Sequence, residues 1–248
     1  MIPCSEPNHS KSQSQCRTCS TPFATPTETC STFLSTGTNP EKETPLSELQ
    51  FAKEERTRRI VDAAVELAER GGFDAVRLRD VAAQANVALA TVYKRFRSKE
   101  DLMMAALARD ADAFEQLLST NPVVGATAAE RTITFFGLAT EVFCSKPNLA
   151  RAVLRAVSSG DPDLTQKVAQ FQSLVARLIN QAIGGTKEST HPLAHDVQFA
   201  LLLQRIWFAS LVGWMGGLHG IPEVAEQMRF AIERLIPAED AHTLKAVD

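Results

Sequence analysis

The chain has 248 residues, of which 44% are hydrophobic and 22% are charged, and its formal net charge is −3. This composition is ordinary for a soluble globular protein, and it excludes a polycation that binds nucleic acid along its whole length. No apolar run reaches the ~18 residues that span a bilayer, and the first residues lack the hydrophobic core of a signal peptide. We therefore expect a cytoplasmic protein that does not enter a membrane.

Residues 1–50 are rich in Ser, Thr, Pro, Gln and Asn and show almost no apolar periodicity. Such a segment cannot bury enough apolar surface to offset its chain entropy, so we expect a disordered N-terminal extension. A basic arm that reaches into a DNA groove is an alternative, but Lys11, Arg17 and Lys42 are too sparse to favour it.

This extension also holds four of the five cysteines. Cys16 and Cys19 have the spacing of half a zinc knuckle, but no second close pair completes a site. Cys4 and Cys30 lie far from them in sequence. Structural zinc normally needs four well-spaced ligands, so the sequence favours no metal here.

The first clear helix is amphipathic and runs over residues 53–70. Apolar side chains recur on one face of it at helical spacing and would point inward. They are Ile60, Ala63, Ala64, Leu67 and Ala68. Gly71 and Gly72 would end the helix, because glycine readily takes the backbone conformation found at helix C-termini.

Two short helices around a tight turn come next, and this is the pattern of a helix-turn-helix. The first covers residues 78–84, and Asn86 can take the left-handed conformation that stops it. The second covers residues 89–95. Ser98 then begins a long helix, and Asp101 three residues later completes a capping-box pattern. The second helix of such a unit fits the major groove of DNA.

The charge distribution agrees with that geometry. Between residues 77 and 99 the only anion is Asp80, whereas the cations are Arg77, Arg79, Lys94, Arg95, Arg97 and Lys99. A basic surface that also carries hydroxyl groups suits the phosphates that provide most of the affinity for DNA. The alternative is that these cations only solvate a helical face.

The segment resembles the DNA-binding domain of the tetracycline-repressor (TetR) family of bacterial regulators. The matching stretches are RRIVDAAVELAERGGFDAV, RDVAAQANV, ATVYKRF and SKEDL, with Asn86 where the family usually has Gly. The resemblance implies an all-α fold. A three-helix helix-turn-helix domain would cover residues 51–98, and a helical effector-binding and dimerisation domain would cover residues 99–240.

The resemblance also implies roles for residues in and around the second short helix. We expect phosphate contacts from Thr91, Tyr93 and Lys99. The residues placed to meet base edges are Leu89, Ala90 and Lys94. Further DNA contacts are expected from Arg77, Arg79 and Arg95. The predicted partner is a double-stranded DNA operator.

Beyond Ser98 the chain reads as a series of helices without an alternating strand pattern. The expected helices cover residues 98–121, 128–144, 147–157, a stretch that follows Pro162 and ends at Ile183, 193–218 and 222–236. We interpret the first of these helices as a mechanical link between the two domains, because a rigid helix can transmit a tilt.

The helix over residues 193–218 is hydrophobic nearly all round, so it must be covered on every side. With the last helix it resembles the pair that dimerises this family as a four-helix bundle, and Gly213, Gly216 and Gly217 would permit close approach of helices. We expect a homodimer, since helix-turn-helix proteins usually read two half-sites about a two-fold axis. The alternative is the central core helix of a monomer.

Aromatic side chains of the second domain can line a cavity for an apolar ligand, although aromatics at helical spacing more often form plain core. The candidate pocket residues are Phe136, Phe143, Phe171, Phe199, Trp207 and Trp214, with Phe135, Phe208 and Met215 as further candidates. The stretch RLRDVAAQANVALATVYKRF and the two tryptophans of the late helix are similar to the steroid-catabolism repressor branch of the family. That resemblance implies a bulky apolar effector such as a sterol-derived molecule or a fatty acyl-CoA.

Other chemistry has little support. His191 and His195 have a metal-chelating spacing with Asp196 beside them, but Pro192 places His191 at or before a helix start. Two surface histidines are therefore favoured over a metal site. Cys144 has no base near it in sequence that would make it a nucleophile. No phosphate-cradling glycine loop, nucleophile elbow or paired-carboxylate pattern occurs, so we expect neither an enzyme nor a cofactor.

The sequence thus predicts a ligand-responsive, dimeric repressor that binds a palindromic operator and is released by its effector. Its two recognition helices would lie about one DNA turn apart, ~34–36 Å or a multiple of it. The alternative is a helical protein-interaction module without specific DNA binding. An enzyme would need a convergent set of titratable groups, which the sequence does not display.

Overall fold

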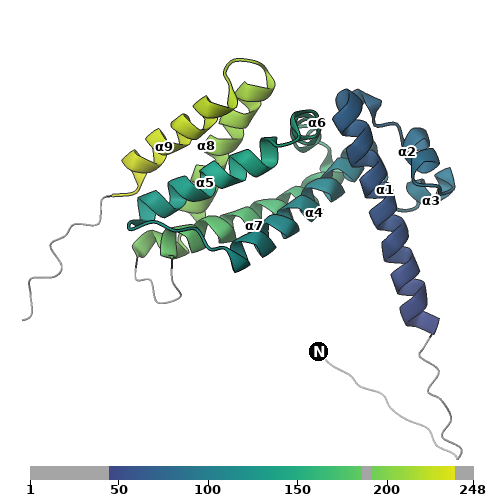
Figure 1. The fold of residues 1–248 in the computed structure, drawn as a ribbon, viewed down its shortest axis with the longest axis horizontal. Coiled ribbons are helices and arrows are strands. Elements are labelled where there is room, and N and C mark those ends of the chain that lie inside the picture. The colour runs from purple at the N-terminus through teal and green to yellow at the C-terminus, as the bar shows by residue number, and fades with distance from the viewer. Residues whose placement is uncertain (1–44, 186–190, 238–248) are drawn as a thin grey trace, which may run out of the picture. The chain divides into compact units, whose positions relative to one another are not determined.

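The computed structural model of the protein describes residues 45–185 and 191–237, and every regular element in these ranges is a helix (Figure 1). The predicted all-α fold is confirmed. The cysteines of the N-terminal extension, which raised the question of a zinc site, lie outside the described residues. So does the rest of that extension up to residue 44.

The helix-turn-helix unit consists of three helices. They are α1 (Pro45–Ala75), α2 (Leu78–Gln84) and α3 (Leu89–Tyr93). α2 has the predicted bounds. α3 ends at Tyr93 rather than at Arg95, because the Arg95 N–H bonds back only three residues, to the Val92 carbonyl (2.9 Å). This shorter reach tightens the chain into a turn.

α1 begins at Pro45, inside the segment of residues 1–50 that its composition predicts to be disordered. Proline is favoured at the first position of a helix, where its missing N–H would have no partner in any case. The absence of apolar periodicity over residues 1–50 does not reveal such a start. The break at the glycine pair occurs where the sequence predicts it. Gly72 has a φ of 68°, and one further helical turn then leads to Ala75.

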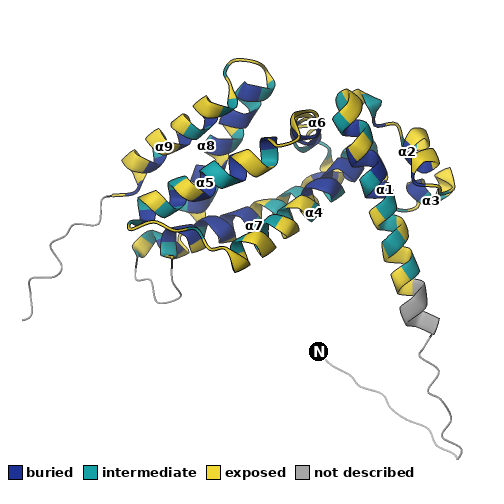
Figure 2. Cartoon of the chain, in the orientation of Figure 1, coloured by how far each residue is buried: buried dark blue, intermediate teal, exposed yellow. Residues whose placement is uncertain are grey.

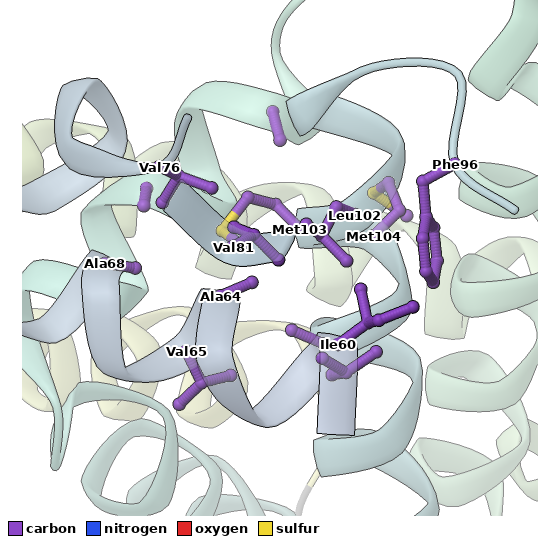
Figure 3. Packing of buried hydrophobic residues seen from close by; sticks show 14 of the residues in the cluster. Ile60, Ala64, Val65, Ala68, Val76, Val81, Phe96, Leu102, Met103 and Met104 are labelled. Atoms are coloured by element: carbon purple, nitrogen blue, oxygen red, sulfur yellow. The ribbon is translucent and has the colours of Figure 1, made fainter. Parts of the chain in front are cut away.

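The apolar faces of α1, α2, α3 and α4 (Lys99–Thr120) meet in one hydrophobic cluster (Figure 3). Its fully buried members include Ile60, Ala64, Val81, Val92 and Leu102. Helices as short as α2 and α3 are not stable alone in water, because helix nucleation is unfavourable. Their stability therefore comes from burial in this cluster, which also fixes their orientation.

The same cluster continues into α6 (Pro147–Val157) through Leu149, Ala152, Val153 and Ala156. α6 packs against both α1 and α4. The hydrophobic core beneath the helix-turn-helix therefore includes residues from both sides of the expected domain boundary at residues 98 and 99.

α4 begins with the predicted cap. The Ser98 Oγ accepts a hydrogen bond from the Asp101 N–H (3.1 Å), and the Asp101 carboxylate accepts one from the Arg97 N–H (3.0 Å). These bonds satisfy N–H groups that a helix start otherwise leaves unpaired. α4 then runs from the first cluster, where Leu107 is buried, to a second cluster that Phe114 contacts.

The second cluster holds the rest of the described chain together. It is formed by α5 (Ala128–Cys144), α6, α7 (Thr165–Gly184), α8 (Val197–Met215) and α9 (Ile221–Leu235). α8 packs on α7 and α9, and α9 also packs on α5. Phe135, Phe136, Ile179, Leu203 and Met228 are among its largest fully buried side chains.

α8 is shorter than the predicted helix over residues 193–218. Pro192–His195 forms a 3₁₀ turn instead, and the Asp196 carboxylate accepts a hydrogen bond from the Phe199 N–H (3.0 Å), which caps the true start. The apolar pattern runs through both segments and does not reveal this cap.

Within this chain the glycines at the end of α8 close the helix. Gly217 has a φ of 76°, and the Leu218 N–H bonds back to the Gly213 carbonyl (3.0 Å), as in a Schellman motif. A Cβ on Gly213 would lie 2.5 Å from the His219 ring. The close approach at Gly213 is therefore to the loop before α9.

Among the described helices, α8 alone is long and apolar enough to cross a membrane, by length and composition. In the structure 44% of the apolar window is buried inside the protein. Its contacts with α7 and α9 cover part of the apolar surface, and Val197 and Leu202 stay exposed.

Candidate DNA-binding face and effector cavity

α3 presents one side to the core and the other to solvent. Val92 is fully buried, whereas Tyr93 is 57% and Leu89 37% exposed. Ala90 and Lys94 are also exposed, and Figure 2 shows α3 mostly exposed outside its buried anchor. We call these four exposed residues, Leu89, Ala90, Tyr93 and Lys94, the recognition face. The predicted phosphate contact Thr91 lies half-buried beside it.

The turn before α3 is built by Asn86, whose φ of 52° makes it the one non-glycine residue with a positive φ among the described residues. The Val87 N–H bonds to the Ala82 carbonyl (3.0 Å) and the Asn86 N–H to the Ala83 carbonyl (3.2 Å). This is a Schellman closure with asparagine where glycine is usual. It sets the direction in which α3 leaves α2.

Four of the cations around the recognition face have no acidic partner among the described residues, whereas Arg97 pairs with Asp163 at 2.9 Å. Arg77, Arg79 and Lys94 are exposed, Arg95 is half-buried, and none of them forms an ion pair with a described residue. Their charge is therefore not neutralised locally. An uncompensated cationic surface of this kind attracts a polyanion such as DNA.

Lys99, a further predicted phosphate contact, is placed differently. Its Nζ lies 4.0 Å from the centre of the Phe73 ring and 3.8 Å from the Asp74 carboxylate. Arg155 of α6 contacts the same ring at 4.7 Å and the same carboxylate at 3.2 Å. Lys99 is thus already engaged with the end of α1, and a phosphate would compete with Asp74 for it.

An apolar cavity of about 370 Å³ lies between α4, α5, α6, α7 and α8. Small-molecule sites typically enclose about 300–1,000 Å³ and have mostly apolar walls. The apolar wall residues with the largest side chains are Leu107, Phe114, Leu117, Phe135, Phe143, Leu149, Phe171, Leu178 and Trp207.

The cavity includes only part of the predicted pocket. Phe143, Phe171 and Trp207 line it, as does the further candidate Phe135. The other predicted residues do not line the cavity. They are the pocket residues Phe136, Phe199 and Trp214 and the further candidates Phe208 and Met215.

The excluded residues have other contacts. The ring of Phe136 is fully buried and packs against Phe135 at 5.1 Å and Trp207 at 5.8 Å between ring centres. Trp214 is covered by the guanidinium of Arg151, 4.7 Å from its ring centre. Phe199 packs, partly exposed, against the second cluster near the start of α8. Phe136 and Trp214 thus form core, and Phe199 lies at the edge of it.

Much of the wall comes from α4 and α6, which the aromatic pattern does not identify. Leu107, Phe114 and Leu117 belong to α4, and Leu149 and Val153 belong to α6. The apolar stripe of α4 is the sequence signal for the α4 residues, because it continues past the helix-turn-helix core and must pack against further helices.

Hydrogen bonds within the wall leave few free polar groups. The Trp207 Nε1–H donates to the Thr140 Oγ1 (2.9 Å), and that hydroxyl donates to the Phe136 carbonyl (2.7 Å). The polar wall residues are Asp110, Ser145 and Lys146.

The remaining candidates for chemistry contribute no site. Burial raises the pKa of the Cys144 thiol to about 11, which disfavours the reactive thiolate. The His191 Nδ1 accepts a hydrogen bond from the Leu193 N–H (3.2 Å) and caps a 3₁₀ turn, so His191 and His195 do not share one α-helical face. In residues 45–185 and 191–237 no group of three His, Cys, Asp or Glu side chains is arranged to hold a metal ion.

Comparison with known proteins finds relatives for both halves of the described chain. Residues 60–106 match the family of bacterial regulatory proteins named tetR, and residues 125–235 match the tetracyclin repressor-like C-terminal domain. The chain is 31% identical to the HTH-type transcriptional repressor KstR of Rhodococcus jostii, over 75% of this chain and 84% of that protein. It is 28% identical to KstR of Mycobacterium tuberculosis, over 77% and 84% of the two chains.

Solved structures share the fold. A TetR transcriptional regulator from Rhodococcus aligns with a TM-score of 0.61 at 23% identity, over 75% of this chain and 97% of that one. The regulator FadR of Bacillus subtilis in complex with stearoyl-CoA aligns with a TM-score of 0.53 at 20% identity, over 73% and 99%. The chain belongs to the tetR family of bacterial regulatory proteins, and it is a ligand-responsive transcriptional regulator with an N-terminal helix-turn-helix and a helical C-terminal domain.

Proposed function

We propose that this protein is a dimeric, cytoplasmic repressor that releases a palindromic DNA operator when an apolar molecule fills its cavity. The observation that carries this proposal is the position of α4. Its first half is buried in the core that supports α3, and its Leu107, Phe114 and Leu117 line the cavity. One continuous helix therefore contacts both the support of the DNA-binding face and the ligand site.

In the bound state α3 enters the major groove. Leu89, Ala90 and Lys94 meet base edges, and Thr91 and Tyr93 contact phosphates. The exposure of Lys94 and Tyr93 and the lack of a local acidic partner for Lys94 support these roles. Arg77, Arg79 and Arg95 add charge beside α3, and phosphate contacts of this kind fix the register of a protein on DNA.

Dimerisation through α8 and α9 would place two recognition helices on one operator. Apolar side chains remain exposed on these helices, including Val197, Leu202, Phe230 at 62% and Leu235. Exposed apolar groups on neighbouring helices are typical of a surface that a second subunit covers. A two-fold pair would then require the heads to lie ~34–36 Å apart, or a multiple of that distance.

The effector we propose is a bulky apolar molecule, either sterol-derived or a fatty acyl-CoA. The apolar walls and the volume of about 370 Å³ support an apolar ligand body. The resemblance to the steroid-catabolism repressor branch supports the two chemical classes. Binding would shift α4, change the separation of the two heads and lower the affinity for DNA.

Selection of bound duplexes from a random DNA pool tests the DNA-binding half of this proposal. We expect a two-fold symmetric sequence, and Lys94→Gln should relax the preference at one position in each half-site by about 1–3 kcal/mol. Arg177→Gln, which removes the same charge from α7, is the matched control and should leave the preference unchanged. No binding at low salt by a folded dimer would instead support the protein-interaction module.

Sedimentation of a Phe230→Asp variant tests the dimer. A charge at this exposed apolar position should shift the protein towards the monomer and weaken operator binding, because each half-site alone provides half of the contacts. An unchanged dimer would place the interface elsewhere.

A further inference from the structure

The rim of the cavity contains one side chain suited to an anion. Of the polar wall residues, Asp110 carries a negative charge, and the Ser145 hydroxyl already donates to the Val142 carbonyl (2.7 Å). The Trp207 Nε1–H donates to Thr140. Lys146, whose side chain is 50% exposed, is the remaining wall donor among the described side chains.

Lys146 is also loosely held. Its Nζ lies 3.9 Å from the Glu69 carboxylate of α1, the longest ion pair among the described residues. By contrast, Arg177 pairs with Glu115 at 2.8 Å in a neighbouring groove between α1, α4 and α7. Exposed ion pairs contribute little to stability, so an anionic ligand at the rim can displace Glu69 from Lys146 at little energetic cost.

We propose that the effector is an amphipathic anion, with an apolar body in the cavity and one acidic group bound by the Lys146 ammonium. This inference rests on the proposed function, since it specifies the ligand of the same cavity. A charge-assisted hydrogen bond to the Lys146 ammonium is stronger than a bond between two neutral groups. Asp110 on the opposite helix α4 repels the acidic group and directs it towards α6.

The same lysine connects the ligand to the DNA-binding unit. Lys146 pairs with Glu69 on α1, and the neighbouring Asn148 side chain donates to the Glu69 carbonyl (2.9 Å). An acidic group that takes Lys146 away from Glu69 therefore removes one of the contacts between α6 and α1. Because this ion pair is exposed and 3.9 Å long, acidic ligands should lower DNA affinity only slightly more than neutral ligands of equal size.

Calorimetric titration of the full chain with decanoate and with 1-decanol tests the inference. The two probes share an apolar chain and differ in the acidic group. The wild type should bind decanoate about tenfold or more tightly than decanol, the ratio expected of one charge-assisted hydrogen bond. Lys146→Gln should bring the two affinities together, and Arg177→Gln should preserve the difference.

Glu69→Gln provides a second variant that does not touch the cavity wall. Without its competitor for Lys146, decanoate should bind more tightly, while decanol should bind as it does to the wild type. Equal binding of both probes by the wild type, or a preference for decanoate that survives Lys146→Gln, would overturn the inference and leave the apolar effector intact. Failure of both probes to bind would count against the proposed effector site itself. Unfolding curves establish that each variant is folded.

Discussion

The recognition face and the effector cavity are built in opposite ways. The face is a short run of neighbouring residues around Tyr93 and Lys94, and it is exposed and held from behind by buried Val92. The cavity brings together residues as distant in sequence as Leu107 and Trp207, and its wall donor Trp207 is satisfied internally. The face can therefore change with little effect on folding, whereas the cavity cannot. Substitutions at the two sites should separate binding to DNA from stability.

The largest effect is expected at the cavity wall. Trp207→Ala removes a buried ring and the donor to Thr140, and it should lower the free energy of unfolding by about 3–5 kcal/mol. Urea unfolding measures this loss. Trp214→Ala is the matched control on the same helix: it should also destabilise the protein, but decanol affinity should change only in the Trp207 variant. Equal changes in ligand affinity would mean that the wall has been assigned wrongly.

A smaller loss is expected at the frame behind the cavity. Arg131 of α5 donates to the Ala182 carbonyl (3.1 Å) and the Ile183 carbonyl (2.6 Å), which are at the end of α7. Hydrogen bonds from a charged donor to orphan carbonyls contribute about 1.5–3 kcal/mol, so Arg131→Ala should destabilise the protein by about 2 kcal/mol in urea unfolding. Arg131→Lys keeps the charge and loses the planar fork. Full stability of the Ala variant would show that the α7 terminus is satisfied by water.

The turn of the helix-turn-helix should show a loss of about 1 kcal/mol. Asn86→Ala places a residue with a Cβ and no compensating amide at a φ of 52°, and thermal unfolding should report the strain. Asn86→Gly is the control, because glycine takes this conformation without strain and should be at least as stable as the native residue. A destabilised Gly variant would indicate that the asparagine side chain has a role beyond the turn.

The smallest effect on folding is expected beside the recognition face. Arg79→Gln removes an exposed cation with no described acidic partner, so stability should stay within about 0.5 kcal/mol. Operator affinity measured over a range of salt concentrations should instead show a slope reduced by about 0.9, the value for one lost phosphate contact. Arg177→Gln should leave the slope as it is. A marked loss of stability in Arg79→Gln would contradict the contrast between the two sites.

This contrast also explains how far the sequence can predict the structure. The bounds of α2 and the caps at Asn86 and Ser98 follow from residues within one turn of each other, so local rules are sufficient. The start of α8 depends on Asp196, a cap hidden inside an apolar pattern. Trp207 and Trp214 are seven residues apart and share one face of α8, so which of them lines the cavity depends on where along α8 the neighbouring helices leave space. Trp207 and Trp214 are equivalent by composition and differ only in their tertiary neighbours.

The side chains of α6 that complete the hydrophobic cluster beneath α1 have a consequence for how this protein can be divided or recombined. A fragment that stops before α4 would lose the cover that Leu149 and Val153 give to that cluster. The helix-turn-helix unit should therefore not fold as an independent domain. A chimera that joins this unit to the effector half of a relative must keep matching surfaces on α1 and α6. Substitutions on the solvent side of α3 can change operator preference without disturbing the fold, while the contact of α1 with α6 keeps the helix-turn-helix unit matched to the effector-binding helices of the same chain.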